Sequence, residues 1–120
     1  MSASENNTDT GDIENLIDEC EDQGSIKLDE KTYELTPDKE THLYLNKSIS
    51  IEGIHEKTII EGKNSTLFLD VEKEPEPDYN GTVIIAKGLY DIKNTGKHII
   101  FKNITFKDLN LNFEILSYLC

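Results

Sequence analysis

Ser48-Ile-Ser-Ile-Glu-Gly53 predicts the fold of this chain, together with the two runs that follow it, Thr58-Ile-Ile-Glu-Gly62 and Leu67-Phe-Leu-Asp-Val71. Apolar residues at every second position predict strands with one buried and one solvent-facing side. The order of strand, polar corner, strand, polar corner and strand recurs in His98-Ile-Ile-Phe-Lys-Asn103, Ile104-Thr-Phe-Lys-Asp108 and Leu111-Asn-Phe-Glu-Ile115. A repeat of this kind indicates coils that stack on one another.

Short strands of this type are predicted along the whole chain after residue 24. They are Ser25–Leu28, Thr32–Leu35, His42–Leu45, Ser48–Glu52, Thr58–Glu61, Thr66–Val71, Thr82–Ala86, Leu89–Ile92, His98–Phe101, Ile104–Lys107 and Leu111–Ile115. Hairpin signals are sparse, and the best is Asn80-Gly81. Three strands with three corners make one coil, and coils stack about 4.8 Å apart. The sequence therefore predicts a mainly β fold, a parallel β-helix of about four coils over residues 25–120, interrupted by an acidic loop at 72–80.

One amphipathic helix is predicted over residues 11–24, after a disordered tail at 1–10. Ile13, Leu16, Ile17 and Cys20 fall on one helix face. Thr10 or Asp12 can cap its start, and Gly24 suits its end. Acids crowd its outer face and oppose the helix dipole at the C-terminus, so the helix needs to dock through its apolar face.

This helix is expected to cover one end of the stacked coils. No matching cap is evident at the other end, where the chain carries four apolar residues: Phe113, Ile115, Leu116 and Leu119. An uncovered end of a sheet is a template for association. We therefore expect self-association through the uncapped C-terminal end. Cys20 and Cys120 lie at opposite ends of the predicted stack, too far apart for a disulfide.

The chain carries a net charge of −12, and 10 of those charges come from residues 1–40, which hold 13 acids and three lysines. A basic stripe for phosphate contacts is absent, so we expect neither nucleic acid nor anionic lipid as a partner. The sequence contains no run of about eighteen apolar residues, so no membrane insertion is expected in this segment.

Several sequence segments resemble those of a known family. They are Gly24-Ser-Ile-Lys-Leu28, Asn46-Lys-Ser-Ile-Ser-Ile-Glu-Gly53, Lys57-Thr-Ile-Ile-Glu-Gly62 and Phe101-Lys-Asn-Ile-Thr-Phe106. From about residue 12 onward, the chain resembles the N-terminal part of archaeal adhesin-like surface proteins with pectin-lyase-like repeats. The resemblance implies a right-handed parallel β-helix, an extracellular or cell-surface location, a structural or adhesive role, and carbohydrate or another cell-surface protein as partner. The chain departs from the family in its shortness, and Met1 to Thr10 is polar and acidic, without the apolar run expected of a signal peptide.

Five Asn-x-Ser/Thr sequons agree with export: Asn6, Asn46, Asn64, Asn80 and Asn103. A second interpretation stays open, because Asn is also favoured at corners and Thr in strands.

Some enzymes that cleave carbohydrates share this architecture, and their catalytic residues can be compared with the residues of this chain. The lyases of the resembled family commonly use an arginine as base, and this chain has no arginine. The hydrolases use paired carboxylates within a set of motifs, of which only Asn7-Thr8-Asp9 matches by letters, inside the predicted tail. We therefore predict no catalytic residues and a non-catalytic module. The alternative is the N-terminal part of a carbohydrate-active lyase or hydrolase whose active site lies in later coils.

The candidate metal and ligand sites in the sequence involve acids, histidines and tyrosines. The acids of 70–78 alternate, which points carboxylates apart and favours a solvated loop over a calcium site. His42, His55 and His98 lack a second ligand at helical or hairpin spacing. The five tyrosines could form a sugar-stacking platform, although half-buried strand tyrosines are the favoured interpretation. The sequence thus predicts no metal ligands, no cofactor-binding residues and no cofactor.

Overall fold

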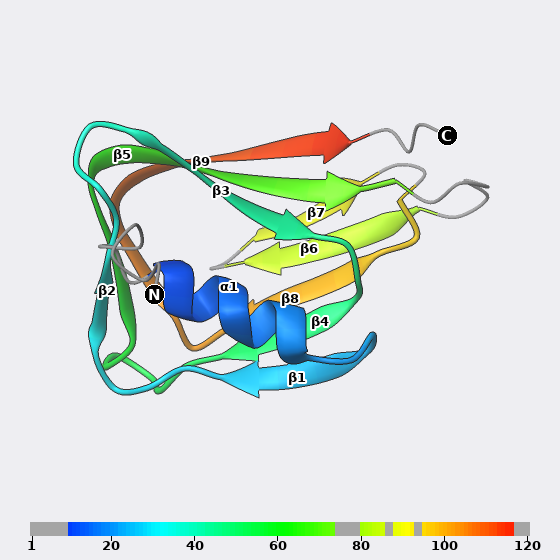
Figure 1. Cartoon of the computed structure of the whole chain (residues 1–120), viewed down its shortest axis with the longest axis horizontal. Coiled ribbons are helices and arrows are strands. Elements are labelled where there is room, and N and C mark those ends of the chain that lie inside the picture. The colour runs from blue at the N-terminus through cyan, green and yellow to red at the C-terminus, as the bar shows by residue number, and fades with distance from the viewer. Residues whose placement is uncertain (1–9, 74–79, 86–87, 93–94, 117–120) are drawn as a thin grey trace.

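The computed structural model describes residues 10–73, 80–85, 88–92 and 95–116, which form two β-sheets and one short helix (Figure 1). This confirms the prediction of a mainly β fold with one N-terminal helix. The elements are α1 (Thr10–Glu19), β1 (Gly24–Lys27), β2 (Thr32–Glu34), β3 (Glu40–Leu45), β4 (Ile49–Glu52), β5 (Ile59–Glu72), β6 (Gly81–Ile85), β7 (Gly88–Ile92), β8 (His98–Lys102) and β9 (Thr105–Leu116).

The first sheet, called sheet A here, has the strand order β1-β4-β8-β6-β7. Its first three strands are parallel and in register, so Ile26, Ile51 and Phe101 lie side by side. The second sheet, sheet B, contains β2, β3, β5 and β9. Among the described residues, six of the seven strand pairings are parallel.

Sheet B bends because its long strands turn a corner. The first part of β5 pairs with β2 and its second part with β3, so two predicted strands are joined into one. The register against β9 shifts between Glu61 and Ser65, where Lys63 and Asn64 have positive φ angles of 53° and 67°. A Cβ on Gly62 would lie 2.2 Å from Cβ of Leu109. The corner therefore needs glycine at this position.

The core lies between the two sheets and is built from the alternating apolar residues. Leu43 and Leu45 of β3, with Leu67, Leu69 and Val71 of β5, are at most 1% exposed. A slip of one residue in strand pairing would turn the apolar side chains outward. The observed pairing has no such slip within these runs, so the apolar side of each strand faces the core. The predicted burial of these strands is confirmed.

Helix α1 lies across the end of the core, between β3 and β1 (Figure 1). Ile13 and Ile17 are each 1% exposed, and Leu16 and Cys20 pack at the margin. The helix ends at Glu19 rather than at residue 24. Gln23 has a positive φ of 67°, which is not helical, and Gly24 begins β1. Thr10, expected as tail or cap, is a buried residue of the helix itself. The remainder of the predicted tail lies outside the described residues.

Strands β6 and β7 form an antiparallel hairpin in which Ile85 pairs with Gly88. The connection between them is therefore at residues 86–87. Asn80-Gly81, the best hairpin signal in the sequence, lies instead at the start of β6. A Cβ on Gly81 would lie 2.1 Å from the carbonyl oxygen of Lys97. Glycine is required here because two backbones approach each other closely. Glycine is also favoured in turns, so the sequence alone does not distinguish the two reasons.

The hairpin covers core near β9, which corrects the expectation that this end has no cover. Val83, Ile85 and Ile92 are buried, and the ring of Tyr90 on β7 lies 5.0 Å from that of Phe113 on β9. Phe113 and Leu116 are half-buried and Ile115 is 41% exposed, while Leu119 lies outside the described residues. The cover comes from a segment that precedes β8 in the chain.

Within the described part of the chain, no helix has the length and apolar character needed to cross a membrane. Cys20 is a free, half-buried thiol, and Cys120 lies outside the described residues, so the prediction about a disulfide stays a prediction.

Candidate functional site

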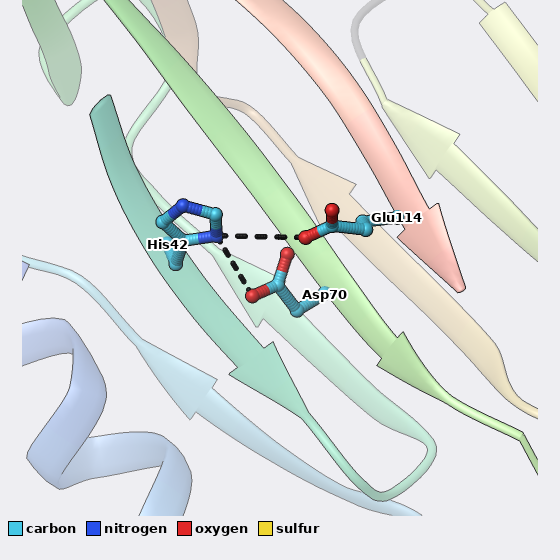
Figure 2. Close-up of side chains that lie close together, drawn as sticks. All are labelled: His42, Asp70 and Glu114. Carbon is cyan, nitrogen blue, oxygen red and sulfur yellow. Dashed lines mark hydrogen bonds and ion pairs between the residues drawn. The ribbon is translucent and has the colours of Figure 1, made fainter. Parts of the chain in front are cut away.

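Three titratable side chains meet on the outer face of sheet B. His42 comes from β3, Asp70 from β5 and Glu114 from β9 (Figure 2). One nitrogen or oxygen atom of each lies within 4.8 Å of the others. We call this group the outer-face cluster.

Parallel register explains how the cluster forms. Asp70 is the direct partner of both Tyr44 and Glu114, so the two carboxylates share one rung of the sheet. The partner of His42 is Phe68, which lies two residues before Asp70 in β5. His42 therefore reaches its partners diagonally along the sheet, a direction that long side chains can span.

The imidazole of His42 lies against both carboxylates. Its Nδ1 donates a hydrogen bond of 2.8 Å to Oδ2 of Asp70, and the same nitrogen is 3.8 Å from Oε1 of Glu114. The other ring nitrogen, Nε2, is 3.7 Å from Oε1 of Glu40. The ring is stacked on Phe68, with centroids 4.6 Å apart and planes 10° from parallel. Stacking and charge together fix the orientation of the ring.

Asp70 forms the buried floor of the cluster. The residue is 9% exposed and its side chain 13%, whereas the side chains of His42 and Glu114 are 43% and 49% exposed. Oδ1 of Asp70 is buried and has no hydrogen-bond partner. A buried carboxylate oxygen without a partner loses its water and gains nothing in return, which costs free energy.

Comparison of the chain with protein-family models, with curated proteins and with solved structures finds no match.

The chemistry of the cluster follows from its donor atoms. One imidazole nitrogen and two carboxylates can share a proton, or they can supply three ligands to a divalent cation. Both uses neutralise the repulsion between Asp70 and Glu114, which share a rung. The cluster lies on an open sheet face and not at the bottom of a cleft, as its half-exposed members show.

The expectation that the histidines are isolated is wrong for His42. The other two histidines lie elsewhere: His55 is 3.6 Å from neighbouring Glu56, and His98 shares a 3.1 Å hydrogen bond with Thr82. The sequence does contain a signal for this cluster. The runs His42-Leu-Tyr44, Phe68-Leu-Asp70 and Asn112-Phe-Glu114 can be aligned by their central, inward-facing residues. This alignment places the outward-facing residues of the three strands, His42, Asp70 and Glu114 among them, next to one another.

The acidic segment 70–78 divides at the end of β5. Asp70 and Glu72 are strand residues on the outer face, and the hydroxyl of Tyr44 donates a hydrogen bond to Oε1 of Glu72. Residues 74–79 lie outside the described residues, as does the letter match Asn7-Thr8-Asp9. The prediction of a solvated loop therefore stays a prediction.

The described tyrosines do not share one surface. Tyr33 is 3% exposed, and its hydroxyl accepts a hydrogen bond from the backbone nitrogen of Asp29. Tyr44 is 45% exposed on sheet B, and Tyr90 is 44% exposed on β7. Tyr79 and Tyr118 lie outside the described residues. A sugar-stacking platform is not formed by the three tyrosines that the structure describes.

A shallow cavity of about 490 Å³ lies between the segment after α1 and the outer face of sheet A. Its polar lining includes Asp22, Ser48 and His98. The backbone nitrogen of Ser48 donates to Asp22, and that of His98 donates to the Ser48 hydroxyl. These polar groups hydrogen-bond one another and so connect neighbouring segments of the chain. The outer-face cluster, which contains an unpartnered buried oxygen, is therefore the stronger candidate site.

Proposed function

We propose that this chain is a non-catalytic structural and adhesive module, the N-terminal cap and first coils of a cell-surface adhesin-like protein, wound as a right-handed parallel β-helix. The observation that supports it is the in-register parallel pairing of equivalent strands. Strands β1, β4 and β8 follow one another in sheet A, and β3, β5 and β9 in sheet B.

In this proposal the coils are β1–β3, β4–β5 and β8–β9. They number three, one fewer than the four expected, because β6 and β7 pair as an antiparallel hairpin instead of forming a coil of their own. The hairpin then takes the place of a further strand beside β8.

In this proposal the solvent-facing sides of the two sheets bind the partner. The partners would be carbohydrate or another cell-surface protein, and the location extracellular. Four of the five sequons are described, and their asparagines, Asn46, Asn64, Asn80 and Asn103, are all exposed. Asn64 and Asn103 also have positive φ angles, 67° and 58°, so local backbone conformation accounts for Asn at these two corners without any glycan.

The stacking of coils is tested by paired cysteines in a chain whose own cysteines are replaced by serine. Ser25 and Ser50 are direct parallel partners on the outer face of sheet A. Ser25→Cys with Ser50→Cys should form a disulfide on mild oxidation, read as a loss of about 2 Da by mass spectrometry, since parallel neighbours lie within bridging distance. Ser25→Cys with Glu52→Cys is the control, shifted by two residues, and should oxidise far less. Equal oxidation of both pairs would contradict the stacking, and a crystal structure with left-handed coils would contradict the handedness.

The non-catalytic role is tested with acidic and neutral polysaccharides incubated with the full chain, with and without Ca²⁺. We expect no rise in unsaturated uronate absorbance or in reducing ends. Binding is then measured with the immobilised chain on a glycan array and against extracted surface proteins of candidate cells. Saturable binding without turnover supports the proposal, whereas turnover of any polysaccharide, or the absence of binding to both classes, argues against it.

A further inference from the structure

We propose that the outer-face cluster binds one divalent transition-metal cation, of which Zn²⁺ is the model, through Nδ1 of His42 and one oxygen each of Asp70 and Glu114. The cation would tie together β3, β5 and β9, which are three successive neighbours in sheet B. This inference rests on the side-chain geometry alone and does not depend on the proposed surface role.

The first support is the buried, unpartnered oxygen of Asp70. Figure 2 shows the two carboxylates of Asp70 and Glu114 facing the same ring nitrogen of His42, with the second oxygen of Asp70 between them. Oδ1 has no hydrogen-bond partner, and a like charge lies on the same rung. A cation bound to the Asp70 carboxylate would neutralise the pair of acids and would offset the cost of burying an unpartnered oxygen.

The second support is the spacing of the donor atoms. A tetrahedral site with bonds of about 2.0–2.1 Å separates its ligand atoms by about 3.3 Å. The two separations from His42 Nδ1, 2.8 Å to Asp70 and 3.8 Å to Glu114, fall on either side of this value. The side chain of Glu114 is half-exposed, so a change in its torsions would adjust the longer separation.

The third support is the arrangement around the ligands. Phe68 stacks on the imidazole and holds its plane, while Oε1 of Glu40 lies 3.7 Å from the remaining nitrogen, Nε2. A metal-bound histidine commonly donates its other N–H to a carboxylate, which orients the ring and raises its basicity. Glu40 is placed for that role after a small approach.

The donor set selects the class of cation. Imidazole nitrogen suits Zn²⁺, Cu²⁺ and Ni²⁺, whereas Ca²⁺ takes six to eight oxygen ligands and Mg²⁺ retains most of its waters. Three protein ligands leave a fourth position for water on the solvent side. The cation would compete with the proton that His42 shares with Asp70, so binding should release a proton and weaken in acid.

The experiment is a titration of the full-length chain with Zn²⁺, read by calorimetry and by competition with a chromophoric chelator. Cys20 and Cys120 are replaced by serine so that thiols contribute nothing. We expect one saturable site at pH 7.5, a higher melting temperature with Zn²⁺, weaker binding at pH 5.5, and no displacement by millimolar Ca²⁺ or Mg²⁺. Co²⁺ in the same site should give visible absorption bands of a four-coordinate N/O complex.

His42→Ala and Glu114→Gln should each weaken Zn²⁺ binding by at least tenfold and remove the rise in melting temperature. Glu114 is half-exposed on an edge strand, so its variant should fold, which circular dichroism checks. His98→Ala and Glu52→Gln are matched controls on the outer face of sheet A and should bind as the parent does. Absence of saturable Zn²⁺ binding, retention of full affinity in both cluster variants, or preference for Ca²⁺ would overturn the proposal.

Discussion

Lys47 shows at the scale of one residue how a distant side chain completes a helix. Its Nζ donates hydrogen bonds of 2.7 Å and 2.8 Å to the carbonyl oxygens of Ile17 and Cys20. The last turn of α1 contains no basic residue of its own. A cation at the C-terminus interacts favourably with the helix dipole. Lys47 is a second donor to the carbonyl of Ile17, which also accepts a 3.2 Å hydrogen bond from the backbone nitrogen of Cys20.

Replacing Lys47 by methionine should lower the free energy of unfolding by about 1–3 kcal/mol, because hydrogen bonds from a charged donor and a dipole interaction are lost together. Urea denaturation followed by circular dichroism measures the change. Lys27→Met is the control, since Lys27 is 78% exposed and pairs with Glu52 on the surface, and its loss should cost less than about 1 kcal/mol. Similar effects of the two substitutions would show that Lys47 does not act as a cap.

At the scale of the element, α1 contains an electrostatic conflict. Burial raises the pKa of the Glu14 carboxyl above its ordinary 4.5, and the charge of Asp18, four residues later, adds to the rise. The folded state therefore holds the proton at pH values where the unfolded state has already lost it. Stability from this group is fully present below the unfolded pKa and is lost as pH rises through the folded pKa.

Glu14→Gln should accordingly stabilise the protein at pH 7, by about 0.5 kcal/mol for the like-charge pair it removes. The gain should shrink below the folded pKa and vanish under about pH 4, where the carboxyl is protonated in both states. Thermal denaturation across pH 3–8 measures both features. Asp12→Asn is the comparison, because Asp12 lies in the first turn and favours the helix dipole, so its loss should give no gain. A gain in Glu14→Gln that persists at pH 3 would contradict the assignment.

At the scale of the whole molecule, β9 is an edge strand. It spans Thr105–Leu116 and, among the described strands, pairs only with β5. All of its residues are exposed or half-buried. The hairpin covers part of the neighbouring core through Tyr90 and Phe113. No strand in the described part of the chain pairs with the other edge of β9, so the backbone groups on that edge can accept a further strand.

We therefore keep the expectation of self-association and place it at the β9 edge, between two copies of this chain. Sedimentation velocity should show the weight-average mass rising with protein concentration. Ile115→Lys puts a charge on the edge and should shift the association to concentrations at least severalfold higher. Leu89→Lys, on a residue 62% exposed in the hairpin, should leave it unchanged. A monomer at every concentration up to about 1 mM would contradict an open edge.

The strands and the covering helix could be predicted from the sequence, because alternation at period two and the i, i+3, i+4, i+7 spacing are local patterns. Ile49 and Ile51 are buried as predicted, and so are Ile13 and Ile17. The pairing of the strands is a property of the folded chain. The antiparallel hairpin and the outer-face cluster both follow from register, and register depends on contacts between residues far apart in the chain. His42 and Glu114 are 72 positions apart and become neighbours only because β5 lies between their strands.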